Sequence, residues 1–140
     1  MKSQSFSVFA VWQLLALLTV TPLFAQSPNP MRFETAFDFS VGDRALPAGE
    51  YTVSTIGSAL QVRSMDNKQI ATILTHSTSR PAVEEQGKLV FNRYGNTYLL
   101  SEVWRPGELT GQELSKSSQE RELAQGQSSP SQTILVAETE

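Results

Sequence analysis

Cysteine is absent from the 140-residue chain, and histidine occurs once, at position 76. The lack of cysteine excludes disulfides, a thiolate nucleophile, cysteine-ligated zinc, iron–sulfur clusters and a lipid-modified cysteine anchor within this chain. A single histidine excludes the two-histidine zinc motifs. We therefore expect no metal site and no cofactor, and a domain stabilised by burial of its apolar side chains alone.

Positive charge is also scarce, with 11 Lys and Arg against 14 Asp and Glu. Nucleic acids and anionic membrane surfaces are bound by clustered Lys and Arg. The mildly acidic balance therefore argues against nucleic acid and against a membrane surface as partners.

The start of the chain has the layout of a secretory signal peptide. Lys2 supplies a positive start, residues 6–25 contain no charge, and Pro22 breaks a helix shortly before the small Ala25. We expect cleavage between Ala25 and Gln26, which removes Lys2 and changes the formal net charge from −3 to −4. The alternative is an uncleaved anchor, because about 20 apolar residues span a bilayer.

The remaining chain is interpreted as one exported domain. Residues 26–31 are a polar linker after the signal peptide of residues 1–25, and residues 32–140 form a single β domain with a C-terminal helix and tail. An exported protein of this kind is expected in the periplasm or outside the cell.

Short segments with alternating apolar and polar residues predict strands. RFETAFDF (32–39) places its phenylalanines on one side, which is typical of a half-buried strand. Gly57 and Ser58 form a two-residue turn that suits a type II′ hairpin. The clearest hairpin joins KLVFNRY to TYLLSEVWR through Gly95 and Asn96.

The C-terminal part predicts one helix and a last strand. Thr110 and Glu113 have the spacing of a capping box, so we expect a surface helix over about residues 111–124. TILVA (133–137) is apolar and β-prone, and we expect it to be a final edge strand. The fold class is mainly β, either a small antiparallel sandwich or a partly closed barrel of six or seven strands.

Three segments resemble a group of small exported bacterial proteins that has no assigned activity. They are VGDRALPAGEYTV, KLVFNRYGNTYLLSEVW and RPGELTGQELSKSSQERELA. The resemblance implies the same order of leader, β domain and charged C-terminal helix. It carries no functional residue over to this chain.

No arrangement of reactive residues indicates catalysis. His76 stands at the end of a predicted strand, and no nucleophile-elbow motif surrounds a serine. Glu84 and Glu85 are adjacent, so on an extended segment they point to opposite sides, unlike the facing carboxylates of a glycosidase. We therefore expect no catalytic residue and no enzyme activity.

Aromatic residues around the clearest hairpin are the candidate ligand-binding residues. Tyr94, Tyr98 and Trp104 could form a platform, and Arg93 could stack on a ring or clamp an anion. The alternative is that these rings belong to the core, since a domain of this size needs about as many aromatic side chains as it has.

The function expected from the sequence is a non-catalytic binding or structural module of the periplasm or cell exterior. Its partner is a protein, a glycan or a small apolar ligand, and a sheet edge could also join copies of the chain. The alternative is a small carrier with an apolar cavity lined by Phe37, Phe39, Phe91 and Trp104. A hydrolase-type enzyme ranks third.

Overall fold

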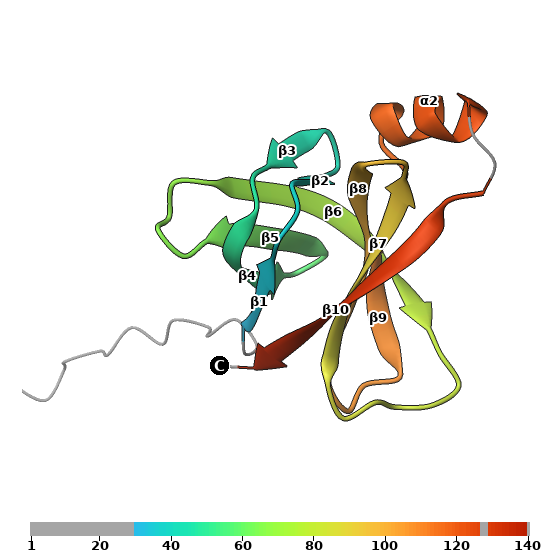
Figure 1. The fold of residues 1–140 in the computed structure, drawn as a ribbon. Helices are drawn as coiled ribbons and strands as arrows, with labels where there is room; N and C mark the ends of the chain where they lie inside the picture. Colours follow the sequence, from blue (N-terminus) through green and yellow to red (C-terminus); the bar gives the residue numbers. More distant parts are fainter. Residues whose placement is uncertain (1–29, 127–128, 140) are drawn as a thin grey trace, which may run out of the picture.

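The computed structural model describes residues 30–126 and 129–139, so the predicted signal peptide, including Ala25 and Gln26, lies outside the described residues. Within these residues there are ten strands and one helix (Figure 1). In chain order they are β1 (Met31–Thr35), β2 (Phe39–Val41), β3 (Arg44–Leu46), β4 (Gly49–Ile56), β5 (Ala59–Ser64), β6 (Ile70–Ser79), β7 (Gly87–Tyr94), β8 (Thr97–Trp104), β9 (Thr110–Leu114), α2 (Ser118–Gly126) and β10 (Ser131–Thr139).

Eight of the strands form a closed antiparallel barrel. Their order is β8-β7-β10-β1-β4-β5-β6-β9, and pairing of β8 with β9 closes the ring. The hairpin β2–β3 is extra and joins β8 through a short parallel pairing. The expectation of a mainly β barrel with one helix is confirmed, although the barrel is fully closed and the described strands number ten instead of six or seven.

Two long strands change partners along their length and turn the corners of the barrel. In β6, Ile70–Leu74 pair with β5, whereas Thr75–Ser79 pair with β9. In β10, Ser131–Ala137 pair with β7 and the last two residues pair with β1. Strands that pass from one sheet to another in this way build the corners of orthogonally packed β structures.

Both predicted two-residue hairpins are present. Gly57 joins β4 to β5 with φ of 60°, and Gly95 joins β7 to β8 with φ of 63°. A positive φ at the first turn residue is the requirement of a type II′ turn, and glycine meets it without strain.

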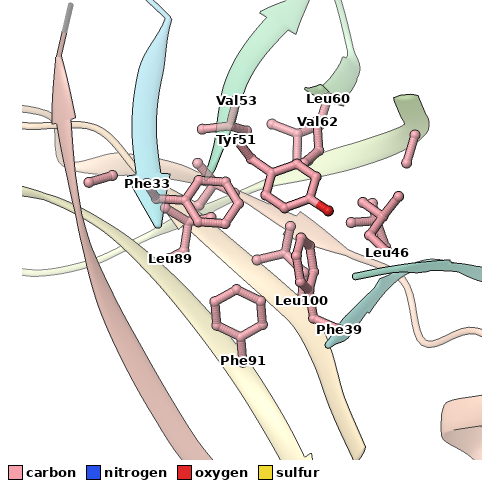
Figure 2. Close-up of a cluster of buried hydrophobic side chains, with 14 of the residues drawn as sticks. Phe33, Phe39, Leu46, Tyr51, Val53, Leu60, Val62, Leu89, Phe91 and Leu100 are labelled. Atoms are coloured by element: carbon pink, nitrogen blue, oxygen red, sulfur yellow. The ribbon is translucent and has the colours of Figure 1, made fainter. Parts of the chain in front are cut away.

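Aromatic and branched side chains from the inner face of the strands fill the barrel. Figure 2 shows Phe33, Phe39 and Tyr51 gathered among aliphatic neighbours. The rings of Phe33 and Tyr51 stack with their centroids 5.7 Å apart, and Phe39 meets Tyr51 edge to face at 5.1 Å. Leu46 of the extra hairpin is also buried in this core. Each such side chain stabilises the fold by about 1.5–3 kcal/mol.

The helix begins later than predicted. Thr110–Leu114 form β9 because they pair with both β6 and β8, which closes the barrel. The capping hydroxyl is that of Ser117, which accepts a hydrogen bond of 3.1 Å from the backbone N–H of Glu120. The true helix, Ser118–Gly126, therefore uses the second Ser/Thr-x-x-Glu motif of this region and not the first.

Three further expectations are corrected. The last strand is longer than 133–137, and it is not an edge, because β10 lies between β7 and β1. Met31, assigned to the linker, is the first residue of β1 and is buried. The segment 32–39 is not one strand, because the hydroxyl of Thr35 hydrogen-bonds to both the N–H and the carbonyl oxygen of Phe37, which turns the chain.

Candidate interaction groove

The four predicted ligand-binding residues lie in three separate environments. Tyr94 is 2% exposed on the outer face of β7, where its hydroxyl donates to the carboxylate of Glu120 on α2 at 3.4 Å. Burial raises the pKa of Tyr94, and the charge of Glu120 raises it further. Glu120 is itself buried and accepts a second hydrogen bond, of 2.8 Å, from the Asn92 side chain. Tyr94 is thus covered by the contact that attaches α2 to the barrel.

Trp104 is also covered. Its indole lies against Gly111, and the guanidinium carbon of Arg80 lies 3.7 Å from the ring centroid. Glu84 bridges Arg80, at 3.1 Å, and Lys88, and its hydrogen bond with Lys88 is the main cause that lowers the pKa of Glu84. Arg80, from the loop at residues 80–86, therefore covers the face of the Trp104 ring on which a ligand would stack.

Tyr98 and Arg93 do lie together, at the end of the barrel. Phe37 stacks on Tyr98 with a centroid separation of 3.8 Å, and the guanidinium carbon of Arg93 lies 5.2 Å from the same ring. Arg93 also donates from Nε to the carbonyl oxygen of Gly95 at 2.8 Å. These contacts occupy Tyr98 with partners from its own chain, so the four residues do not assemble into one open platform.

The residues proposed to line a carrier cavity pack against one another instead. Phe91 meets Phe37 at 5.4 Å and Phe39 at 5.6 Å, both edge to face, within the barrel core. Trp104 is on the outer face of β8, away from these three rings, where Arg80 covers it. The interior at this level is filled by the protein's own side chains.

His76 is exposed on β6 and lies opposite Glu113 of β9, with Nε2 3.4 Å from a carboxylate oxygen. Such an exposed cross-strand pair stabilises a sheet only slightly. In the stretches 30–126 and 129–139, no group of three or more His, Cys, Asp or Glu residues is arranged to hold a metal ion.

The largest recess described on the surface is a groove of about 660 Å³, within the range of ligand-binding sites. We call it the interaction groove. One wall of the groove is the first half of β6. The other walls are the turn between β2 and β3 and the connection from β9 into α2, and Figure 1 shows both on the same side of β6. Buried Val41 and Ala71 form part of its floor, and Arg44, Lys116 and Arg121 stand on its rim.

The groove runs along a stretch of strand edge with which no described strand pairs. Ile70–Leu74 pair with β5 on one side, but β9 pairs with β6 only from Thr75 onward. The hydrogen bonds from Thr75 N–H to Ser58 and from Ser64 N–H to Gln69 show that odd-numbered residues of this stretch point toward β5. Because backbone groups alternate along an antiparallel strand, those of Ile70 and Thr72 point away from β5, to the groove side.

The rim of this groove is positively charged. Arg44, Lys116 and Arg121 are exposed, and Asp43 is the one acidic residue among those that line it. Arg121 is positioned by a hydrogen bond of 3.3 Å from Nε to the carbonyl oxygen of Lys116. An apolar floor, a strand edge and a basic rim together favour an extended segment that carries negative charge.

Sequence reasoning missed this groove. The notable sequence signal is the break between β9 and α2 at Ser115–Ser117, which ends β9 before it can cover the first half of β6.

Comparison of the chain with known protein families, with curated proteins and with solved structures gave no match. In the described parts of the chain, no helix is both long and apolar enough to cross a membrane.

Proposed function

We propose that this chain is an exported, non-catalytic binding module that captures an extended, acidic segment of a partner protein in the interaction groove. The observation that supports this function best is the unpaired edge of β6 at Ile70 and Thr72, which borders the groove. A segment added there as a further strand would hydrogen-bond through its main chain, and its alternate side chains would meet the groove floor.

The charges on the rim support an acidic partner over a second copy of this chain. If two copies paired through the same edge about a two-fold axis, each would bring Arg44, Lys116 and Arg121 toward the corresponding residues of the other. Like charges placed together oppose association, whereas carboxylates on a bound strand complement the rim.

A proline substitution tests the role of the strand edge. Thr72→Pro removes an N–H that points to the groove side and not to β5, so the ladder to β5 keeps its hydrogen bonds. Thr72→Ala is the matched control, because it shortens the same exposed side chain and keeps the N–H. Circular dichroism establishes that both variants retain the fold.

Binding is measured by fluorescence anisotropy with a labelled peptide of alternating Glu and Val residues, and with a second peptide of alternating Lys and Val. We expect the acidic peptide to bind the wild type and Thr72→Ala but not Thr72→Pro. We expect the basic peptide not to bind. The proposal fails if the acidic peptide binds none of the three proteins, or if it binds Thr72→Pro as tightly as the wild type.

Export is the second part of the proposal, and it rests on Lys2 and the uncharged stretch of residues 6–25. The test is mass spectrometry of the protein expressed with its own N-terminus and recovered from the periplasm. A mass that begins at Gln26 supports export with cleavage, and an intact chain retained inside the cell contradicts it.

A further inference from the structure

A second recess, of about 230 Å³, lies at one end of the barrel and shares no lining residue with the interaction groove. Strand ends and the connection from β8 to β9 surround it. The residues that line it are Thr55, Ser77, Val103, Arg105, Glu108, Thr110, Gly111 and Gln112. Val103 is buried, so the recess begins where the apolar core ends.

A directed chain of hydrogen bonds links Arg105, just after the end of β8, to the strands β4, β9 and β6. Arg105 donates from Nη2 to the hydroxyl of Thr55 at 3.0 Å, and that hydroxyl donates to the side-chain oxygen of Gln112 at 2.9 Å. The amide nitrogen of Gln112 in turn donates to the Thr75 hydroxyl at 3.4 Å, which donates to the Ser58 carbonyl oxygen at 3.2 Å. Arginine can only donate, so the Thr55 hydroxyl must accept from Arg105 and has its own hydrogen left to donate to Gln112. The directions of the later hydrogen bonds follow in the same way.

The guanidinium of Arg105 is therefore held in position at the recess by a network that orients every member. Arg105 is half-buried, and this burial lowers its pKa, whereas the carboxylate of Glu108 acts in the opposite direction. A positive charge that has lost part of its hydration interacts more strongly with an anion than an exposed one does.

We propose that this recess binds a carboxylate group through Arg105. The planar guanidinium matches a carboxylate in shape and charge, and the hydroxyls of Ser77 and Thr110, which line the same recess, can donate to its oxygens. The volume admits a small monocarboxylic acid or the carboxyl end of a peptide. Both sources present the same chemical group.

Glu108 competes with the ligand. It lines the recess, is exposed, and its charge acts on Arg105. Replacing it with glutamine removes a negative charge from a binding site for an anion. Because exposed charge pairs contribute about 0.2–1 kcal/mol, Glu108→Gln should raise carboxylate affinity about 1.4- to 5-fold.

The experiment titrates the protein lacking residues 1–25 with acetate, with N-acetyl-dialanine and with the C-terminal amide of the same dipeptide. Trp104 is the sole tryptophan of this form and lies against Gly111 of the recess, so its fluorescence reports binding. We expect the two carboxylates to bind and the amide not to bind. If N-acetyl-dialanine binds more tightly than acetate, the natural ligand is the carboxyl end of a peptide. If acetate binds more tightly, the natural ligand is a small acid.

Two variants separate this site from general salt effects. Arg105→Lys keeps the charge but loses the forked donors, and it should weaken binding about tenfold or more. Arg93→Lys, a matched change at the other end of the same hairpin, should leave affinity unchanged. Glu108→Gln keeps the test decisive if Arg105→Lys does not fold. Equal affinities of wild type and Glu108→Gln, or equal binding of acid and amide, would overturn the proposal.

Discussion

Gly111→Ala should destabilise the barrel by displacing Trp104. A Cβ at position 111 would lie 2.6 Å from Cε3 and 2.7 Å from Cδ2 of the indole, closer than the 3.0 Å below which real Cβ contacts essentially do not occur. The ring is not free to yield, because Arg80 lies 3.7 Å from its centroid and Nε1 donates to Glu102 at 2.8 Å. The glycine therefore provides the space in which the tryptophan packs.

The magnitude follows from three contributions. Forcing an added carbon into a packed region costs about 1–3 kcal/mol, and separating Arg80 from the ring loses about another 0.5–1 kcal/mol. The reduced freedom of the unfolded chain offsets about 0.4–1 kcal/mol. We expect a net loss of about 1–3 kcal/mol, with a fall in Tm of about 4–8 °C for each kcal/mol.

Urea unfolding, followed by circular dichroism and by the emission of Trp104, measures this loss. Gly126→Ala is the matched control, because nothing lies within 4 Å of a Cβ added there. It should be as stable as the wild type or up to about 1 kcal/mol more stable, through the same effect on the unfolded chain. The reasoning is refuted if Gly111→Ala is as stable as Gly126→Ala and leaves the emission of Trp104 unchanged.

Two further substitutions test the outer face of β7. Glu120→Ala removes the carboxylate that accepts a hydrogen bond from Asn92, so it should lower the free energy of unfolding by about 1–3 kcal/mol and make α2 sensitive to proteolysis. Glu122→Ala, on the exposed face of the helix, is the control and should do neither. Equal digestion of the two variants would contradict the role of Glu120. Lys88 holds the pKa of Glu84 below its usual 4.5, so the stabilisation by Glu84 is present above that pH and is lost as the pH falls through the lower, folded-state pKa. Glu84→Gln should accordingly be less stable than the wild type at pH 7, and this difference should shrink as the pH falls below 4.5; a difference that does not change with pH in urea unfolding would argue against this ion pair.

Local patterns were sufficient for the hairpins but not for the barrel. Turn chemistry at Gly57 and Gly95 acts within a few residues, so both hairpins could be predicted. The choice of partners for β10 depends on pairing of residues 131–137 with 87–93, and alternation within one strand does not specify a distant neighbour.

The helix error has the same physical origin. Thr110 and Glu113 have the spacing of a capping box, as do Ser117 and Glu120. Residues 110–114 become a strand because β6 and β8 both have unpaired edges at that point, and pairing with them satisfies more backbone groups than a helix end would. Tertiary pairing thus outweighs a local capping signal.

The site residues were difficult to predict for a related reason. Alternation places Asn92 and Tyr94 on the outer face of β7, but the burial of Tyr94 comes from α2, which lies more than 20 residues further along the chain. Likewise, the face of Trp104 is covered by Arg80 from another loop. Exposure of a side chain on the outside of a barrel depends on segments whose docking is not encoded in its own strand.

Amide hydrogen exchange along β6, measured by NMR without any ligand, tests the unpaired edge most directly. We expect slow exchange at Ala71 and Ile73, whose N–H groups point to β5, and fast exchange at Ile70 and Thr72, whose N–H groups point to the groove side. Protection should return where β9 pairs, at His76. If the Thr72 amide of the monomer is as protected as that of Ile73, the edge is already paired and the proposed mode of binding is wrong.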